Sequence, residues 1–500
     1  MVSLTYSVAF RGVEACPVEV QCSLSPGLPG FSIVGLPDKA VSEAKERVRA
    51  ALASMAIAFP SKKVTINLSP ADLPKEGSHF DVPIAISLLA ELDIIPQDLI
   101  VSVVSLGELS LDAKLVQVSG ALPAAITAAE QENLLLCPTT CGKEAAWVSG
   151  ARVIGAKSLG DIVRHFNGQT PIADAIPGEI VAPPPSGDLL DVKGQERAKR
   201  ALEIAAAGRH HMLMVGTPGS GKSMLAQRLP GILPPLSPRE ALETSIVHSV
   251  AGLLDEGGIS RVRPFRDPHH TSSMAAIIGG GRMAKPGEAS LAHNGVLFMD
   301  ELPEFQRNVI ETLRQPLETG SVMISRANAH VKYPCRFLLI AAANPCKCGY
   351  MSDPERACAR VPHCGKDYLG KISGPLMDRF DIQVDVPPVS YAELDLPQEG
   401  DTSAIVAQRV HQALALQNTR FSDHSDVYTN ADISGDLLAE IATPDAEGRA
   451  LLLRAAEKFR LSARGYHRVM RVARTIADLD DSDAVRRPHI AEAVSFRIGL

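Results

Sequence analysis

The sequence contains no long hydrophobic run. In 500 residues no stretch of about 18 apolar residues occurs, so we expect no membrane-spanning helix. Residues 1–6 carry neither a basic n-region nor an apolar h-region, which predicts a cytoplasmic protein and not a secreted one. In the reducing cytoplasm we expect the nine cysteines to stay as thiols or to bind metal, without forming a disulfide framework.

An excess of positive charge is also absent. The formal net charge is −7 at pH 7, which argues against a polybasic protein coated with nucleic acid. The net charge does not exclude a local basic groove, because binding of nucleic acid depends on where the positive charges cluster. The apolar fraction of 45% and the charged fraction of 21% are typical of globular domains, and the chain is long enough for about two to four of them.

A linker divides the chain into unlike parts. Residues 168–190 are rich in proline and glycine and have no sustained helical or strand period. Before them, residues 1–167 alternate short strands with helical patterns and predict a separate α/β domain. After them, residues 191–390 predict a nucleotide-binding α/β domain with a parallel sheet, and residues 391–500 predict an all-helical tail. The helices expected in this tail are 403–417, 432–442, 445–459, 462–479 and 488–497.

One glycine-rich stretch carries the strongest chemical signal. It fits G-x-x-x-x-G-K-[ST], follows a short apolar strand at 211–215 and precedes a helical pattern at 224–229. Its glycines let the backbone fold back so that the amides converge on one anion. We expect Lys222 to reach the β- and γ-phosphates of ATP and the hydroxyl of Ser223 to ligate Mg²⁺. The loop consists of Gly216, Thr217, Pro218, Gly219, Ser220, Gly221, Lys222 and Ser223.

Two further apolar strands end in polar residues. Residues 296–299 lead into Asp300, which would join Ser223 in holding Mg²⁺, and into Glu301, which would orient and polarise the attacking water. Taken alone, such a strand is also common as a buried strand with an acidic turn, but the phosphate loop favours the catalytic interpretation. Residues 337–343 lead into Asn344, whose amide can bond the γ-phosphate or the water, although Asn-Pro after a strand is more often a turn.

Four segments then carry a family resemblance: GTPGSGKS, NGVLFMDELPEF, AAANP and SGPLMDRFD. With them the chain resembles the AAA+ ATPases, and within these the magnesium-chelatase-like branch that also includes the MCM helicases. The resemblance implies that residues 191–196 help to enclose the adenine. It implies that Arg379 is an arginine finger for a neighbouring subunit, which makes hydrolysis depend on a homo-oligomer, here a hexameric ring. It also implies a sensor 2 arginine in a helical lid, Arg464, with Arg468 one turn later as the alternative.

Two segments of the central domain are candidates for contact with DNA. Residues 277–288 correspond to an insert that, in the resembled branch, projects into the pore of the ring. Residues 319–336 predict a β-hairpin, and motors of the MCM type use such a hairpin to grip the phosphate backbone. For each basic residue in these segments the alternative is ordinary polar decoration. The predicted contacts to single-stranded or branched DNA are Arg282, Lys285, Arg326 and Lys332.

Over essentially all 500 residues the chain resembles the YifB/ComM family, whose front domain is similar to the peptidase domain of Lon. The segments FSIVGLPDKAVSEAKERVRAAL and INLSPADLPKEGSHFDVPIAISLLA carry this resemblance. That peptidase needs a Ser–Lys dyad, because an unassisted serine is a weak nucleophile. Here His79 occupies the nucleophile position, Ser78 lies one place early, and Leu122 stands where the lysine belongs. The resemblance implies an N-terminal Lon-peptidase-like α+β domain that keeps the scaffold, for ring assembly or DNA contact, without the dyad.

A group of cysteines follows Asn344. The spacing C-x-C-x₉-C-x₅-C offers four soft ligands for a structural Zn²⁺, although C-x-C is tighter than the usual C-x₂₋₄-C. The alternative is a set of reduced structural cysteines. The residues concerned are Cys346, Cys348, Cys358 and Cys364.

These features lead to three functional hypotheses. The first is a hexameric, ATP-dependent DNA motor of the helicase or branch-migration type that acts in homologous recombination; the resemblance to the YifB/ComM family implies a role in the integration of DNA during natural transformation. The second is the ATPase subunit of a magnesium or cobalt chelatase. The third is an ATP-driven protein remodeller that uses the Lon-like domain for docking. Stimulation of the ATPase by forked DNA would distinguish the first from the other two.

Overall fold

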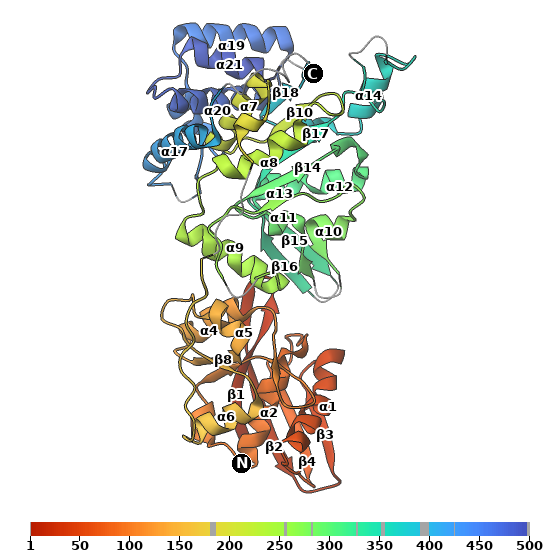
Figure 1. Cartoon of the computed structure of the whole chain (residues 1–500), viewed down its shortest axis with the longest axis vertical. Coiled ribbons are helices and arrows are strands. Elements are labelled where there is room, and N and C mark those ends of the chain that lie inside the picture. Colours follow the sequence, from red (N-terminus) through yellow and green to blue (C-terminus); the bar gives the residue numbers. More distant parts are fainter. Residues whose placement is uncertain are drawn as a thin grey trace.

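The computed structural model is elongated, with the front domain at one end, the nucleotide-binding domain in the middle and the tail helices at the other end (Figure 1). It describes residues 2–180, 187–254, 258–281, 284–326, 329–351, 356–390, 400–424 and 426–497. Arg282 and the side chain of Arg326, both predicted to contact DNA, lie outside what it describes.

The front domain is an α/β domain built on a seven-stranded mixed sheet with strand order β3-β4-β2-β1-β5-β8-β9. Helix α2 is buried along almost its whole length, which explains why its sequence is apolar all round. The strands are β1 (Val2–Arg11), β2 (Glu14–Ser25), β3 (Gly30–Val34), β4 (Lys63–Ser69), β5 (Val103–Ser105), β8 (Leu134–Pro138) and β9 (Arg152–Ala156). The main helices are α1 (Lys39–Ser54), α2 (Asp81–Glu91), α4 (Ala121–Glu130), α5 (Thr139–Ala145) and α6 (Leu159–Phe166).

The central domain contains a five-stranded sheet with order β11-β14-β17-β10-β18, in which every pair of neighbours is parallel. The inner strands are buried on both faces, so each reads as a continuous apolar run. The predicted α/β fold with a parallel sheet is confirmed. The strands are β10 (Met212–Val215), β11 (Phe265–Arg266), β14 (Val296–Met299), β17 (Leu338–Ala343) and β18 (Ile382–Asp385), and the helices around them include α7 (Glu196–Gly208), α8 (Lys222–Ile232) and α9 (Pro238–Ala251).

A hairpin and a short insert extend from this domain toward the front domain (Figure 1). In the hairpin, Val322 on β15 pairs with Tyr333 on β16, and both side chains are buried against the domain core. The insert packs on the hairpin, because the Tyr333 hydroxyl donates to Ala284 O at 2.9 Å. The hairpin strands are β15 (Ser321–Arg326) and β16 (Ala329–Pro334), and the elements around them are α10 (Met274–Ile278), β12 (Gly279–Gly280), β13 (Lys285–Pro286), α11 (Glu288–Leu291), α12 (Arg307–Thr312) and α13 (Arg314–Thr319).

The front domain docks on helix α9. Glu144 is buried between the domains, where its Oε1 accepts from Ser249 Oγ at 2.7 Å, and Gly120 N donates to Ser249 O at 3.1 Å. Trp147 packs with Leu236 of the central domain. These desolvated contacts hold the two domains together more firmly than exposed polar pairs would.

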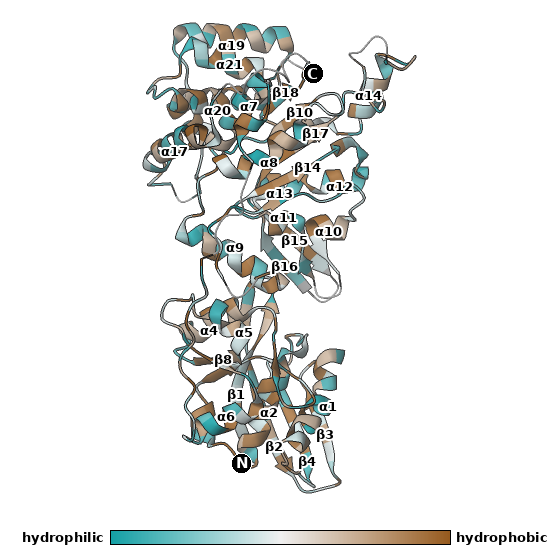
Figure 2. Cartoon of the chain, viewed as in Figure 1, coloured by the Kyte–Doolittle hydropathy of each residue, from teal (hydrophilic) through white to brown (hydrophobic). Residues whose placement is uncertain are grey.

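The tail is an all-helical lid, as predicted. Figure 2 shows brown, hydrophobic residues among the hydrophilic ones on its helices, and the buried residues of the lid join one core cluster with α7, α8 and the sheet. Asp445 and Ser462 cap the starts of two helices by accepting from backbone N–H groups. The helices are α17 (Ser403–Arg420), α18 (Gly435–Ala442), α19 (Ala446–Phe459), α20 (Ala463–Leu479) and α21 (Arg487–Ser495).

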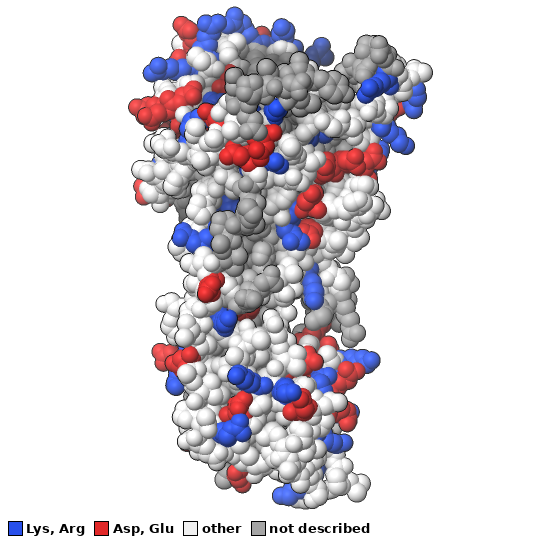
Figure 3. Space-filling model, viewed as in Figure 1, with Lys and Arg blue, Asp and Glu red and all other residues white. Residues whose placement is uncertain are grey.

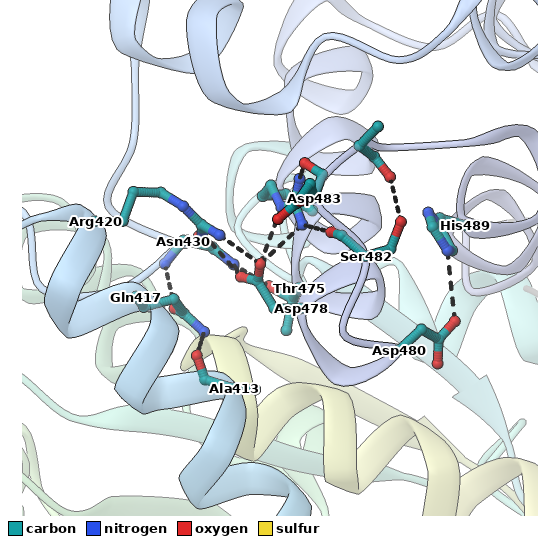
Figure 4. A network of polar contacts seen from close by, with 12 residues as sticks. Ala413, Gln417, Arg420, Asn430, Thr475, Asp478, Asp480, Ser482, Asp483 and His489 are labelled. Atoms are coloured by element: carbon teal, nitrogen blue, oxygen red, sulfur yellow. Dashed lines mark hydrogen bonds and ion pairs between the residues drawn. The ribbon is translucent and has the colours of Figure 1, made fainter.

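A buried polar network fixes the lid helices to one another (Figure 4). The carboxylate of Asp478 is fully buried and accepts from Arg420 at 2.6 Å, from Asn430 at 2.7 Å and from Arg474 at 2.9 Å. Asn430 also donates to Thr475, whose hydroxyl lies 2.7 Å from His210 Nε2 at the start of β10. The lid is therefore tied to the central sheet by polar contacts as well as by its apolar faces.

The helices that the structure describes include none that is both long and apolar enough to cross a membrane.

Candidate active site

The phosphate loop lies between β10 and α8 at the carboxyl edge of the parallel sheet. Gly216 is held so close to the chain after β18 that a Cβ on it would lie 2.1 Å from Val386 O. Gly221 has φ 92°, which L side chains rarely adopt, and it leads directly into α8. These two positions explain why the pattern requires glycine there.

The residues predicted for the nucleotide site come together at this edge. Lys222 Nζ donates to Gly216 O at 2.8 Å and to Asn344 Oδ1 at 3.2 Å, so the ammonium points into the concave side of the loop. Ser223 Oγ donates to Asp300 Oδ2 at 2.7 Å, which places the two predicted Mg²⁺ ligands next to each other. Parallel strands bring these side chains together because their carboxyl ends meet at one edge.

The loop also fits a phosphate group. Over the part of the chain that the structure describes, Thr217 Oγ1 and Ser220 Oγ are buried and have no hydrogen-bond partner. Buried hydroxyls nearly always have one, and phosphate oxygens are strong acceptors. The loop also leads directly into the N-terminus of α8, and a helix N-terminus favours an anion. Burial lowers the pKa of Lys222, while Asp300 and Glu301 favour its charged form.

Glu301 follows Asp300 with a left-handed backbone, φ 51°, and its side chain is half exposed. This turn directs Glu301 away from the buried strand and toward the open edge of the sheet. Two residues that the sequence pattern did not reveal lie beside it. His270 Nδ1 lies 3.7 Å from Glu301 Oε2, and burial together with the charge of Asp300 raises the pKa of Asp267. Both follow the two-residue strand β11, which is too short to be recognised from its sequence pattern.

Arg379 lies at the opposite edge of the sheet, because it precedes β18 whereas the phosphate loop follows β10. It lines a cavity of about 530 Å³ with Arg464 and Arg468 of the lid. The structure therefore brings Arg379 and Arg464 together and keeps both away from Lys222 of the same chain. Burial lowers the pKa of Arg379 below its ordinary value, which Glu318 opposes.

The two candidates for sensor 2 differ in their surroundings. Arg468 Nη1 donates to Arg379 O at 2.8 Å and also pairs with the buried carboxylate of Asp381. Burial alone would raise the pKa of Asp381, but Arg468 and His210 hold it well below its ordinary range. Arg464 is exposed and has no ion-pair partner among the residues that the structure places. Arg468 thus holds the segment around Arg379, while Arg464 is free to meet another molecule.

The candidate DNA contacts that can be placed lie on neighbouring elements. Lys332 is exposed on β16 and Lys285 is exposed on β13. Gly279, at the start of the insert, lies so close to the hairpin that a Cβ on it would come within 2.7 Å of Ile324 Cδ1. Positive charge also gathers over α19 and α21 of the lid in Figure 3, where the exposed residues include Arg449, Arg454, Lys458, Arg460 and Arg487.

The peptidase-like position of the front domain is filled with apolar groups. His79 is buried, and its Nε2 lies 2.8 Å from Val8 O. The ring of Phe10 lies 5.3 Å from that of His79 and fills the space beside Gly120, where a Cβ would lie 2.4 Å from Phe10 Cζ. Leu122 is fully buried, and burial lowers the pKa of His79 to about 4. Within the described front domain, His79 and Leu122, the two positions at which the resemblance implies a missing dyad, are therefore packed into the core.

The four cysteines after Asn344 are free thiols that form hydrogen bonds with one another. Cys346 Sγ lies 3.0 Å from Cys348 Sγ, and both Cys348 and Cys364 also bond to Cys358. Hydrogen bonds from the Cys346 thiol and from backbone N–H groups lower the pKa of Cys348 to about 7. Within the described ranges, no set of three His, Cys, Asp or Glu donors is arranged around a metal position. The zinc site stays a prediction.

Comparisons with known proteins identify relatives of each part of the chain. A family model described as magnesium chelatase, subunit ChlI, matches residues 188–394. A model described as subunit ChlI of Mg-chelatase matches residues 18–140, and one described as magnesium chelatase, subunit ChlI C-terminal, matches residues 400–497.

Full-length relatives are similar over nearly the whole chain. The chain is 43% identical to the competence protein ComM of Haemophilus influenzae, over 99% of this chain and 97% of that protein. It is 40% identical to the protein YifB of Escherichia coli, again over 99% and 97% of the two chains. The magnesium-chelatase 38 kDa subunit of Rhodobacter capsulatus is 23% identical over 61% of this chain and 85% of its own length.

Proposed function

Because the chain belongs to the magnesium-chelatase-like AAA+ family that includes ComM and YifB, we propose that it is an ATP-driven DNA motor of the helicase or branch-migration type. The observation that carries this proposal is the division of the active site between the two edges of the central sheet. Lys222 and Asp300 lie at one edge and Arg379 at the other, so one chain cannot complete the site alone. A closed ring of identical subunits, here a hexamer, supplies each site with the missing arginine.

Each residue of the divided site has a role in hydrolysis. Lys222 binds the β- and γ-phosphates, and Ser223 and Asp300 would hold Mg²⁺, which neutralises the charge on those phosphates when bound. Glu301 orients the attacking water, and the amide of Asn344 hydrogen-bonds the γ-phosphate or that water. Arg379 of the neighbouring subunit stabilises the charge of the transition state, and Arg464, exposed beside it, contacts the same nucleotide.

DNA is the proposed substrate of the motor. The hairpin β15–β16 and the insert beside it extend from the same side of the central domain, and Lys332 and Lys285 are exposed on them. Exposed cations on a pore hairpin suit the phosphate backbone of a strand without regard to its sequence. The name of the Haemophilus relative, a competence protein, supports a role in recombination of incoming DNA during natural transformation.

The deciding experiment is the ATPase rate with forked DNA, with single-stranded DNA and without DNA. We expect both DNAs to stimulate hydrolysis, because in a DNA motor the binding of a DNA strand is coupled to the ATPase site. A rate that DNA leaves unchanged would favour a chelatase-type subunit or a protein remodeller. Stimulation by a protein partner without DNA would identify the remodeller.

Replacing the hairpin cations is expected to weaken the coupling to DNA more than hydrolysis itself. For Lys332→Ala and for Arg326→Ala, we expect an unchanged ATPase rate without DNA and a weaker affinity for DNA. The slope of log K for DNA binding against log salt concentration is expected to fall in magnitude by about 1 for each phosphate-binding cation that is removed. The measurements are DNA-binding isotherms at several salt concentrations and ATPase rates with and without DNA. Lys62→Ala, an exposed lysine at the far end of the front domain, is the matched control. Equal loss of basal and stimulated ATPase in Lys332→Ala would contradict the hairpin assignment.

We also propose that the four cysteines hold Zn²⁺ as thiolates. The hydrogen bonds among the four thiols support it, because they bring four soft ligands of the kind that zinc prefers to one place. Metal analysis of the purified protein is expected to give about one zinc per chain, falling in Cys348→Ser and unchanged in Cys16→Ser. Zinc-free protein with four titratable thiols in the cluster would establish the alternative of reduced structural cysteines.

A further inference from the structure

Arg379 is held against its own subunit. The residue is only 5% exposed, its Nη1 donates to Pro375 O at 2.5 Å, and its Nη2 pairs with the Glu318 carboxylate. Within the described part of the chain its Nε has no partner although it is buried. A guanidinium folded back in this way cannot reach a nucleotide on a neighbouring molecule without first leaving Glu318.

Glu318 is the acidic group that reaches this guanidinium in a strongly positive environment. Arg314, Arg464 and Arg468 all lie close enough to disfavour the charged form of Arg379. Asp381, which lines the same cavity, is already occupied by Arg468 and by His211 N. The side chain of Glu318 is 55% exposed, so the pair is accessible to water and can open.

Glu318 is also the last acidic residue before the hairpin. It lies in α13, and Gly320 turns the chain from α13 into β15 with φ 61°. Hydrogen bonds connect this joint to both strands of the hairpin. The Thr319 hydroxyl donates to Ser321 O in β15 at 2.9 Å, and Cys335 N, just after β16, donates to Gly320 O at 2.9 Å. A Cβ on Gly320 would lie 2.8 Å from Arg336 Cγ, so the end of α13 and the segment after β16 lie against each other at this joint. Because these contacts join the hairpin to α13, we expect a displacement of the hairpin to be transmitted to Glu318.

We propose that Glu318 is a positioning residue that couples the β15–β16 hairpin to Arg379. In the absence of DNA its carboxylate holds the guanidinium against the Pro375 carbonyl. When the hairpin engages a phosphate backbone and shifts, α13 moves with it, the pair opens, and Arg379 extends toward the γ-phosphate of the neighbouring subunit. This inference rests on the proposed function, because it uses Arg379 as the finger and the hairpin as the DNA contact. Hydrolysis then accelerates only on rings that hold DNA.

Glu318→Gln tests the coupling. Glutamine keeps the size of the side chain and an acceptor oxygen but removes the charge that holds Arg379. We expect the ATPase rate without DNA to rise by a factor between about 1.4 and 5, the range that the free energy of a partly exposed ion pair allows. The rate with forked DNA and the KM for ATP are expected to stay unchanged, so that the stimulation ratio falls by the same factor. A purely structural role would change the melting temperature and would leave this ratio intact.

Glu311→Gln is the matched control. It removes a carboxylate on α12 that pairs with Arg314 at 3.3 Å and is not the group that holds Arg379. We expect wild-type rates and a wild-type ratio. If Glu318→Gln fails to fold, Glu318→Asp replaces it, because the shorter carboxylate weakens the pair and is expected to give an intermediate ratio.

The outcomes separate this inference from the proposed function. A stimulation ratio in Glu318→Gln or Glu318→Asp equal to that of the wild type, while Arg379→Ala abolishes hydrolysis, would overturn the coupling and leave the finger in place. Retained hydrolysis in Arg379→Ala would overturn the finger itself. A wild-type ATPase that ignores DNA would overturn the DNA motor, and the coupling with it.

Discussion

Lys222→Ala is expected to abolish ATP hydrolysis. The ammonium is the positive group in the phosphate loop, 2.8 Å from Gly216 O and 3.2 Å from Asn344 Oδ1. Removing this phosphate-binding charge takes away stabilisation of both the bound triphosphate and the transition state, so we expect kcat/KM to fall by about 10³-fold or more. The measurements are steady-state ATPase rates and binding of a fluorescent ATP analogue.

The fold of the Lys222→Ala protein is expected to survive. Burial already disfavours the charged form of this lysine, so its removal relieves a desolvated charge and leaves the apolar packing around α8 intact. We expect a melting temperature close to that of the wild type. Lys45→Ala, at an exposed position in the front domain, controls for a general effect of losing a lysine. Hydrolysis at the wild-type rate in Lys222→Ala would move the active site away from this loop.

Arg379→Ala and Glu301→Gln are each expected to be inactive alone and active when mixed. Loss of an arginine finger lowers kcat by about 10³-fold or more, and loss of the residue that orients the water has a comparable effect. The two residues lie at opposite edges of the sheet, so in the proposed ring they belong to different sites. An Arg379→Ala subunit still offers its Glu301, and a neighbouring Glu301→Gln subunit still offers its Arg379.

Mixing the two inactive proteins before assembly therefore restores intact sites. With random assembly in equal amounts, roughly a quarter of the interfaces combine both intact residues, which sets the expected recovery. The measurement is the ATPase rate across mixing ratios, with each inactive protein mixed with wild type as the control. If Arg379 served its own subunit, every chain would lack one required residue and the mixture would stay inactive.

Much of the fold follows from local sequence patterns. The helices expected at 445–459 and 462–479 are observed as α19 and α20, because Asp445 and Ser462 are N-caps that fix where a helix begins. The apolar runs before Asp300 and Asn344 are buried strands, as expected for the inner strands of a parallel sheet that is covered on both faces. The short strand β11 escaped prediction, since two residues show no period.

Several functional relationships depend on contacts between distant parts of the chain. Nothing in the sequence around Asp267 and His270 places them beside Asp300 and Glu301, because β11 pairs with β14 only in the assembled sheet. Likewise, two arginines one turn apart look alike until the structure pairs Arg468 with Asp381 and leaves Arg464 exposed. Such outcomes depend on long-range packing, which local propensity does not encode.

The sequence by itself determined the chemistry at one edge of the sheet. A glycine-rich loop before a helix, and polar residues directly after apolar strands, converge wherever parallel strands end together. Only the tertiary structure decided two other contacts: the ring of Phe10 lies beside His79 and Gly120 in the front domain, and Arg379 pairs with Glu318 at the base of the hairpin. The physical reason is the same in each case. A local motif fixes its own backbone, whereas a charge or a ring finds its partner only when segments far apart in the chain pack together.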